Sequence, residues 1–220
     1  IYQPMSTVFH YEGITSGTDT TQGMKSYQVE NSKKLFERWQ QRLQLHQAPA
    51  EDVDNAKDRR ALRRVLVIDH CTPTPNQDAG SVTVFNLLML LREMDFQVTF
   101  IPEDNLLYVP EYTTALQRSG IEVLYEPYLT SVKQHLREFG TRYDLTLLFR
   151  PGVMERNVAN IRKYCPNAKV LFHTVDLHYL RMSREAQLLE DESKQKLAEE
   201  MQKREFAAIR AADASIVHST

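Results

Sequence analysis

The chain has 220 residues, of which 42% are hydrophobic and 25% are charged, and its formal net charge is −2. Such a composition is typical of a folded globular protein with one sizeable core and excludes a disordered or fibrous chain. The small net charge also argues against nucleic acid as a partner, because nucleic-acid-binding proteins normally carry a clear basic excess.

The cysteines and the apolar runs indicate the cellular compartment. Cys71 and Cys165 lie in different predicted loops without a CxxC motif, so the sequence suggests neither a zinc site nor a disulfide framework. No stretch reaches the ~18–20 apolar residues that cross a bilayer, and the first residues lack the layout of a signal peptide. We therefore expect a cytoplasmic protein. Because the chain starts without Met and ends directly after a strand-like segment, we also expect it to be a piece of a longer protein.

The first sixty residues are predicted to contain one helix between two irregular segments. A Thr/Ser-rich run with Gly13, Gly17 and Gly23 is typical of a loop. Residues 26–46 carry apolar side chains at a period near 3.6 among many charges, which predicts an amphipathic helix. The polar run 47–60 contains proline and is interpreted as a linker with room for a helical turn. The domain boundary is expected in this linker.

From residue 61 onward, short apolar runs alternate with longer amphipathic segments, which is the pattern of a parallel sheet with crossover helices. Strands are predicted over six segments: 65–70, 97–102, 121–126, 144–149, 169–174 and 215–219. Helices are predicted over five segments: 79–94, 111–119, 128–140, 153–164 and 184–212. Residues 61–220 are therefore expected to form an α/β domain with a Rossmann-like parallel sheet of about six strands and flanking helices.

The loop after the first predicted strand, DHCTPTPNQDAGS at 69–81, is a candidate binding segment, because ligands of open α/β sheets bind at the carboxyl ends of the strands. Gly80 is its only glycine, so it lacks the GxGxxG fingerprint and an NAD-dependent oxidoreductase is disfavoured. Asp78 is placed to cap the following helix. At the helix start, Gly80 would let free backbone N–H groups hold a phosphate or a polar sugar, with the Ser81 hydroxyl beside them. Close packing at Gly80 is the alternative.

The segment HTVDLHYLR after the fifth predicted strand is rich in polar side chains. His173 and Asp176 could hydrogen-bond sugar hydroxyls or assist proton movement from an acceptor hydroxyl, which makes them candidate catalytic residues. His178 is a candidate for substrate binding. The alternatives are a structural cluster in which Asp176 caps the next helical turn, and a metal site built from HxxDxH. Arg150, after the fourth strand, could pair with a phosphate or a carboxylate, or could form a surface salt bridge.

Two segments of this domain, VLVIDHCTPTPNQDAGSVTVFNLLMLLREMDFQVTFIPEDN and VLFHTVDLHYLR, closely resemble the amino-terminal domain of glycosyltransferase family 4. The resemblance covers residues 64–220. It implies the acceptor-side, Rossmann-like half of a retaining enzyme of the GT-B fold, which needs no metal or other cofactor. It also implies that Asp78, Ala79, Gly80 and Ser81 face the acceptor or the donor diphosphate. The family often has paired glycines where this chain has Ala79 and Gly80.

The segment PMSTVFHYEGITSGTDTTQGMKSYQVENSKKLFERW is similar to the carboxyl end of family 2 glycosyltransferase domains, which have the GT-A fold. Residues 1–46 would then be the tail of a GT-A module, 47–60 a linker and 61–220 the front half of a GT-B module. The resemblance implies that His10 is a candidate ligand for the Mg or Mn ion of the GT-A part, and a structural histidine is the alternative. The donor-binding half would lie beyond Thr220, so we expect the chain alone to have little or no catalytic activity.

Together the resemblances predict a hexosyltransferase that moves a sugar from a nucleotide-sugar donor to a polysaccharide or lipid-linked glycan acceptor, as in O-antigen synthesis. They are compatible with peripheral association with the inner membrane or a polysaccharide assembly complex. A non-catalytic, flavodoxin-like binding module is the alternative from another class, because fold does not dictate function. A receiver domain is disfavoured, since Asp69 is the only acid of the cluster that a receiver needs after its first strand.

Overall fold

The computed structural model of the protein describes residues 7–11, 14, 17–48, 51, 53–58 and 61–217, with the backbone alone at 54 and 55. The chain divides into two compact units, Ile1–Arg60 and Ala61–Thr220.

The first unit contains helix α1 (Gly23–Leu43) and the short helix α2 (Val53–Lys57). No side chain of α1 is buried. Phe36 and Trp39, which belong to the apolar pattern that predicted this helix, are 54% and 48% exposed. The helix therefore forms without a packed apolar face among the described residues.

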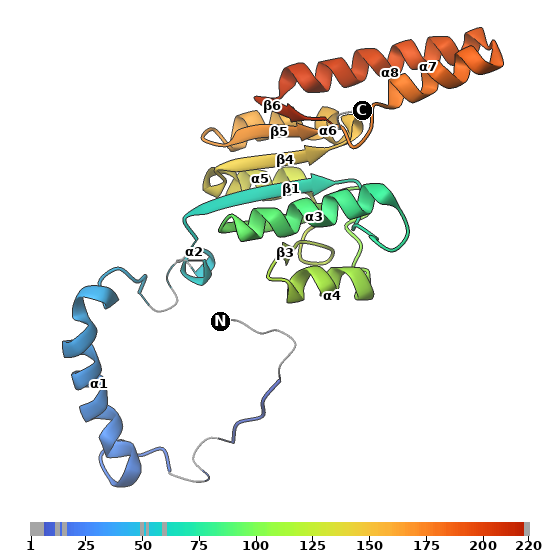
Figure 1. Cartoon of the computed structure of the whole chain (residues 1–220). Helices are drawn as coiled ribbons and strands as arrows, with labels where there is room; N and C mark the ends of the chain where they lie inside the picture. The colour runs from blue at the N-terminus through green and yellow to red at the C-terminus, as the bar shows by residue number, and fades with distance from the viewer. Residues whose placement is uncertain are drawn as a thin grey trace. The chain divides into compact units, whose positions relative to one another are not determined.

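The second unit is built on one parallel sheet (Figure 1). Its strands are β1 (Arg63–Asp69), β2 (Phe96–Pro102), β3 (Glu122–Val123), β4 (Leu145–Phe149), β5 (Lys169–His173) and β6 (Ala214–Ile216). The order across the sheet is β3-β2-β1-β4-β5-β6, and all neighbouring strands are parallel. The predicted α/β fold with a Rossmann-like sheet of six strands is confirmed.

Helices connect each strand to the next, since parallel strands need crossover connections. They are α3 (Ala79–Glu93), α4 (Pro110–Arg118), α5 (Val132–Phe139), α6 (Pro151–Tyr164), α7 (His178–Leu189) and α8 (Glu192–Ala211), with a 3-10 turn η1 at Gly140–Arg142. In Figure 1, α3 lies in front of the sheet and α5 and α6 lie behind it. Within the described part of the chain, no helix combines the length and the apolar character needed to cross a bilayer.

Both faces of the sheet are covered, because strand side chains alternate between two apolar layers. In β1, Leu66 and Ile68 belong to the layer that includes residues of α5, α6 and α8. Val65 and Val67 belong to the layer that includes residues of α3 and α4. All four side chains are fully buried. The core thereby fixes the carboxyl end of β1, from which the first binding loop departs.

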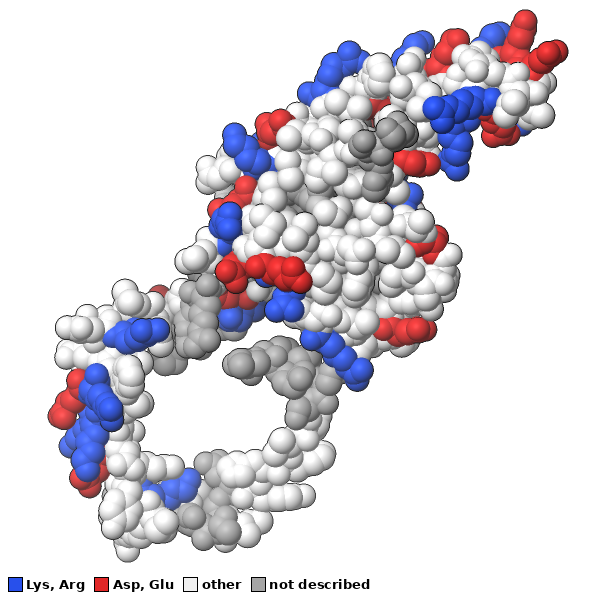
Figure 2. All heavy atoms as spheres, in the orientation of Figure 1, with Lys and Arg blue, Asp and Glu red and all other residues white. Residues whose placement is uncertain are grey.

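The single helix predicted over 184–212 is wrong, because α7 and α8 form a hairpin. Glu190 adopts a left-handed backbone with φ 49°, and the Asp191 carboxylate then caps α8 by accepting two backbone N–H groups of its first turn. Lys194 bridges back to Glu185 at 2.7 Å. Figure 2 shows acidic and basic side chains interspersed over this hairpin, so much of its surface faces water.

Candidate functional site

The strand order reverses between β1 and β4, and this reversal determines where a ligand can bind. The chain leaves β1 toward β2 on one side and leaves β4 toward β5 on the other, so the two loops diverge at the carboxyl ends of these strands. Open α/β sheets have their ligand crevice at this point. Helices α3, α6 and α7 begin in the loops that follow β1, β4 and β5, so their first turns lie at the same edge of the sheet.

Asp69, the last residue of β1, links the two diverging loops. Its side chain is 3% exposed, and its Oδ1 atom lies 3.1 Å from Arg150 Nε and 3.1 Å from His70 Nδ1. The hydrogen bond to Asp69, with a further contact to Cys71, raises the pKa of His70 to about 9. His70 is therefore an imidazolium at neutral pH, and two cations share one buried carboxylate.

The start of α3 carries its own acidic cap. As predicted, Asp78 caps this helix: it accepts hydrogen bonds from the Ser81 backbone N–H at 2.8 Å and from the Ser81 hydroxyl at 2.5 Å. The bond from the Ser81 hydroxyl is the main reason that the pKa of Asp78 lies below its usual range. The carboxylate of Asp78 thus occupies the helix start at which the sequence suggested a phosphate.

Gly80 is the point at which α3 approaches the loops after β4 and β5 most closely. A methyl group added to Gly80 would lie 3.1 Å from Asp78 Oδ1, 3.3 Å from Val175 Cγ1 and 3.5 Å from Arg150 Nη2. Contacts at 3.1 and 3.3 Å are tighter than ordinary van der Waals separation. A larger residue would therefore force these side chains to shift, which supports close packing of three loops as the explanation of Gly80.

A cavity of about 470 Å³, called the main cavity below, gathers most of the predicted residues. Its walls are formed by Asp78, Ala79, Gly80, Thr83, Arg150, Val175, Asp176, His178 and Arg181. Six of the nine predicted site residues are in this set, and Ser81, His173 and His10 are not. Three loops that are far apart in sequence thus meet around one space.

His178, the first residue of α7, lies between two carboxylates. Its Nδ1 atom is 3.0 Å from Glu205 Oε1, and its Nε2 atom is 3.1 Å from Asp176 Oδ1. Glu205 is 0% exposed and also accepts the backbone N–H groups of His178 and Tyr179, so a residue of α8 caps α7. The sequence had offered Asp176 as an alternative cap for this helical turn. The Asp176 side chain is instead 48% exposed, and it lies 3.8 Å from Arg181.

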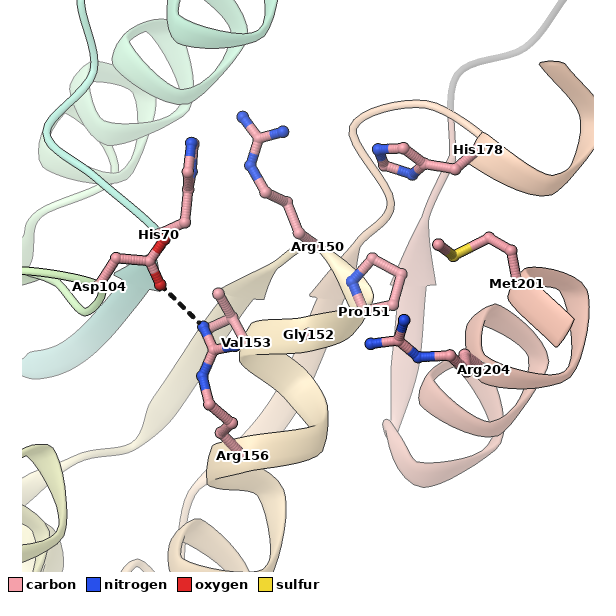
Figure 3. Close-up of a pocket in the computed structure, with 10 residues that line it drawn as sticks. All are labelled: His70, Asp104, Arg150, Pro151, Gly152, Val153, Arg156, His178, Met201 and Arg204. Atoms are coloured by element: carbon pink, nitrogen blue, oxygen red, sulfur yellow. Dashed lines mark hydrogen bonds and ion pairs between the residues drawn. The ribbon is translucent and has the colours of Figure 1, made fainter. Parts of the chain in front are cut away.

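A smaller cavity of about 240 Å³ adjoins the main cavity, because Arg150 and His178 line both (Figure 3). In addition to His178, its walls carry four basic side chains: His70, Arg150, Arg156 and Arg204. Figure 3 shows the side chains of His70 and Arg150 extending away from the strand ends in the same direction.

Two of these basic side chains have acidic partners of their own. Arg156 pairs with Glu103 at 2.6 Å and with Asp104 at 3.0 Å. Arg204 pairs with Glu155 at 2.7 Å. Arg156 therefore faces two carboxylates and Arg204 one, whereas His70 and Arg150 share a single carboxylate.

His173, predicted as a catalytic residue, lies at the end of β5 but is turned into the fold. It is 2% exposed, and its ring stacks on Phe149 with centroids 5.1 Å apart. Its Nδ1 atom accepts the backbone N–H of Val175 at 2.9 Å. His173 therefore supports the turn after β5, and direct contact between its ring and a ligand would require that turn to move.

The described residues include no group of three or more His, Cys, Asp and Glu side chains that could hold a metal ion. In the HxxDxH segment, His173 is bonded to Val175, and His178 is held between Asp176 and Glu205. His10 is exposed in the first unit. These contacts leave no open ligand set for the HxxDxH alternative, and the Mg or Mn site that the GT-A resemblance implied at His10 stays a prediction.

The sequence analysis did not predict three residues that organise the site: Asp69, His70 and Glu205. Asp69 and His70 had a usable signal, because they are a polar pair directly after a buried strand that ends at the switch point. Glu205 had no local signal, since it lies 27 residues after its partner His178 in a helix with many charges.

Comparison of the chain with models of protein families, with curated proteins and with solved structures found no match. The inference of function therefore depends on the site and on the residues that form it.

Proposed function

We propose that residues 61–217 form the acceptor-side half of a nucleotide-sugar-dependent glycosyltransferase, with the main cavity as the place of sugar transfer. The observation that carries this proposal is the convergence of three loops on that cavity, with the cation of Arg150 and the carboxylate of Asp176 on its walls. A crevice at the switch point of an open parallel sheet is the usual ligand position in this architecture.

The crevice combines basic groups with carboxylates. His70 and Arg150 share Asp69, a group called the basic side below, while Asp176 pairs with His178 and Arg181. Guanidinium groups bind phosphate oxygens through charge-assisted hydrogen bonds, and a carboxylate accepts hydrogen bonds from hydroxyl groups. A nucleotide sugar with a glycan acceptor brings both kinds of group, which matches this combination.

In the proposed reaction, Asp176 accepts a hydrogen bond from the acceptor hydroxyl and orients it toward the donor sugar. His178 fixes the Asp176 carboxylate through the contact at 3.1 Å. As the bond between the sugar and the diphosphate breaks, the acceptor oxygen bonds to the sugar, the acceptor proton passes to the departing diphosphate, and Arg150 stabilises the negative charge that develops there. No step in this scheme uses the buried ring of His173.

The proposal includes a polysaccharide or lipid-linked glycan as acceptor and a cytoplasmic location, with peripheral attachment to the inner membrane or an assembly complex. Cys71 and Cys165 are free thiols, which agrees with a reducing compartment.

The test is a thermal-shift panel of nucleotide sugars, nucleoside diphosphates and glycan acceptors with the 220-residue chain. Because the donor-binding half is expected beyond Thr220, we expect a glycan acceptor to raise the melting temperature, and Asp176→Asn and Gly80→Val to weaken this effect. Asp95→Asn makes the same change as Asp176→Asn on an exposed residue just before β2 and should have no effect. Stabilisation of the folded chain by NAD, or by none of the sugar ligands, would overturn the proposal and favour a binding module.

A further inference from the structure

The basic side of the crevice carries a surplus of positive charge at one position. Arg150 Nε and His70 Nδ1 both lie 3.1 Å from Asp69 Oδ1, so one carboxylate faces two cations. Arg156 has two acidic partners, Glu103 and Asp104. The excess of two cations over one carboxylate therefore holds at Asp69 itself, because the second acid at Arg156 offsets it over the smaller cavity as a whole.

Arg150 also has hydrogen-bond donors available for a ligand. Among the described residues, its guanidinium bonds only to Asp69, and does so through Nε. Nη1 and Nη2 remain for a partner, and the side chain is 26% exposed. Figure 3 shows the guanidinium at the crevice, between the side chains of His70 and His178.

The backbone of Arg150 is unusual in a way that fits a binding role. Its φ is 69°, in the left-handed region that favours glycine, and Pro151 follows as the first residue of α6. Its N–H donates to the carbonyl of His173 at 3.1 Å, which holds this conformation. Such backbone geometry in a bulky residue is typically retained where the position of its side chain matters.

We propose that Arg150 and His70, anchored together on Asp69, form a binding site for a phosphate or diphosphate group. Arg150 supplies a two-nitrogen fork to the oxyanion, and His70 supplies charge at short range. The start of α3 is disfavoured as the site, because the Asp78 carboxylate accepts the backbone N–H and the hydroxyl of Ser81 and places a negative charge there. This inference rests on the proposed function for the identity of the molecule that carries the phosphate, which is either a nucleotide sugar or a free phosphate compound.

Protonation of His70 should control the affinity of this site. Asp69 and Cys71 contact the imidazole, and Arg150 opposes its charge from the loop after β4. Asp104 and Arg156 line the same cavity from the end of β2 and from α6. With its pKa raised to about 9, His70 keeps its charge at neutral pH and loses it above that value.

Calorimetry with inorganic pyrophosphate on the 220-residue chain tests the site. We expect His70→Gln and Arg150→Lys each to weaken binding roughly tenfold, as the loss of one charge-assisted interaction implies. Arg118→Gln removes an exposed positive charge at the far end of α4, and it should change the affinity less than about twofold. The advantage of the unmodified chain over His70→Gln should disappear between about pH 7 and about pH 10.

The circular dichroism melt of each variant checks that it folds. Glutamine should be tolerated at position 70, because the His70 side chain is 37% exposed. No binding of pyrophosphate, equal binding by all variants, or an equal loss in Arg118→Gln would overturn the site. The thermal-shift panel with glycan acceptors separates the two proposals. Pyrophosphate binding that depends on His70, without stabilisation of the chain by any glycan acceptor, would leave the oxyanion site standing and remove the glycosyltransferase. Stabilisation by a glycan acceptor, with pyrophosphate binding that neither substitution weakens, would remove the oxyanion site and leave the glycosyltransferase.

Discussion

The carboxylate of Glu205 in α8 accepts the backbone N–H of His178 at 2.8 Å and lies 3.0 Å from Nδ1 of the same residue. This carboxylate is 0% exposed, and it also accepts the N–H of Tyr179. One buried group therefore caps α7 and fixes the ring of His178 at the wall of the crevice.

Removal of this group should destabilise the second unit. We expect Glu205→Ala to lower the free energy of unfolding by about 2–4 kcal/mol, because α7 loses its cap and His178 loses a buried partner. Urea unfolding followed by far-UV circular dichroism measures this, since the single tryptophan, Trp39, lies in α1 of the other unit. Glu199→Ala, an exposed change on the same helix, is the control. Equal losses in both variants would contradict the capping role.

The cap of α3 should show a dependence on pH. Asp78→Ala is expected to lower the free energy of unfolding by about 1 kcal/mol at neutral pH. The pKa of Asp78 is lowered by Ser81, so its contribution is present above the ordinary carboxyl pKa, about 4, and is lost as the pH falls through the lowered value. Urea midpoints of the two proteins should converge as the pH falls from about 5 through that lowered value. A difference that does not change with pH would count against this cap.

The charge of His70 can be observed directly by NMR titration of its ring signals. We expect a midpoint near the raised pKa of about 9, and a shift of that midpoint toward the ordinary value in Asp69→Asn. The stability that this interaction contributes is fully present below the unfolded-state pKa, about 6.5, and is lost as the pH rises through the folded value. The urea midpoints of the unmodified chain and His70→Gln should therefore differ most below that range. A His70 midpoint near 6.5, unchanged in Asp69→Asn, would refute the coupling.

Replacement of Gly140 and of Gly152 by alanine should have opposite effects on stability. A methyl group on Gly140 would lie 2.5 Å from the Tyr164 carbonyl oxygen, so Gly140→Ala should cost about 1–3 kcal/mol of stability. On Gly152, in the first turn of α6, the nearest atom would be Arg156 Nη1 at 3.4 Å. Gly152→Ala should therefore be neutral or stabilising by up to about 1 kcal/mol. Thermal melts of the two variants make the comparison, and similar losses in both would refute the packing explanation.

Much of the fold could be predicted because its signals are local. The apolar run of β1 and the Asp78 cap of α3 are written in consecutive residues, and the structure confirms both. The turn between α7 and α8 also had a local signal, the capping group of Asp191, but the continuous charge pattern around it masked the break. Gly140 was predicted as a helix end, and it holds that position, but its φ of −60° is helical and the close approach of Tyr164 explains the glycine.

The candidate site was less accessible to sequence reasoning, because its contacts join distant segments. Asp69 and Arg150 are 81 residues apart in the chain, and only the pairing of β1 with β4 brings them together. His173 illustrates the opposite difficulty, since a histidine at a strand end suggests chemistry while its ring packs on Phe149. The roles assigned to Asp176 and His178 stay predictions until a ligand is observed.

The most direct test of the glycosyltransferase proposal is an NMR titration of the isotope-labelled chain with glycan acceptors, which reports where binding occurs. We predict that the amide signals of Gly80, Arg150, Val175 and His178, which surround the main cavity, shift together, whereas Gly120 at the far end of α4 does not. The absence of any shift with all the glycan acceptors, or shifts confined to the opposite end of the strands, would contradict the account.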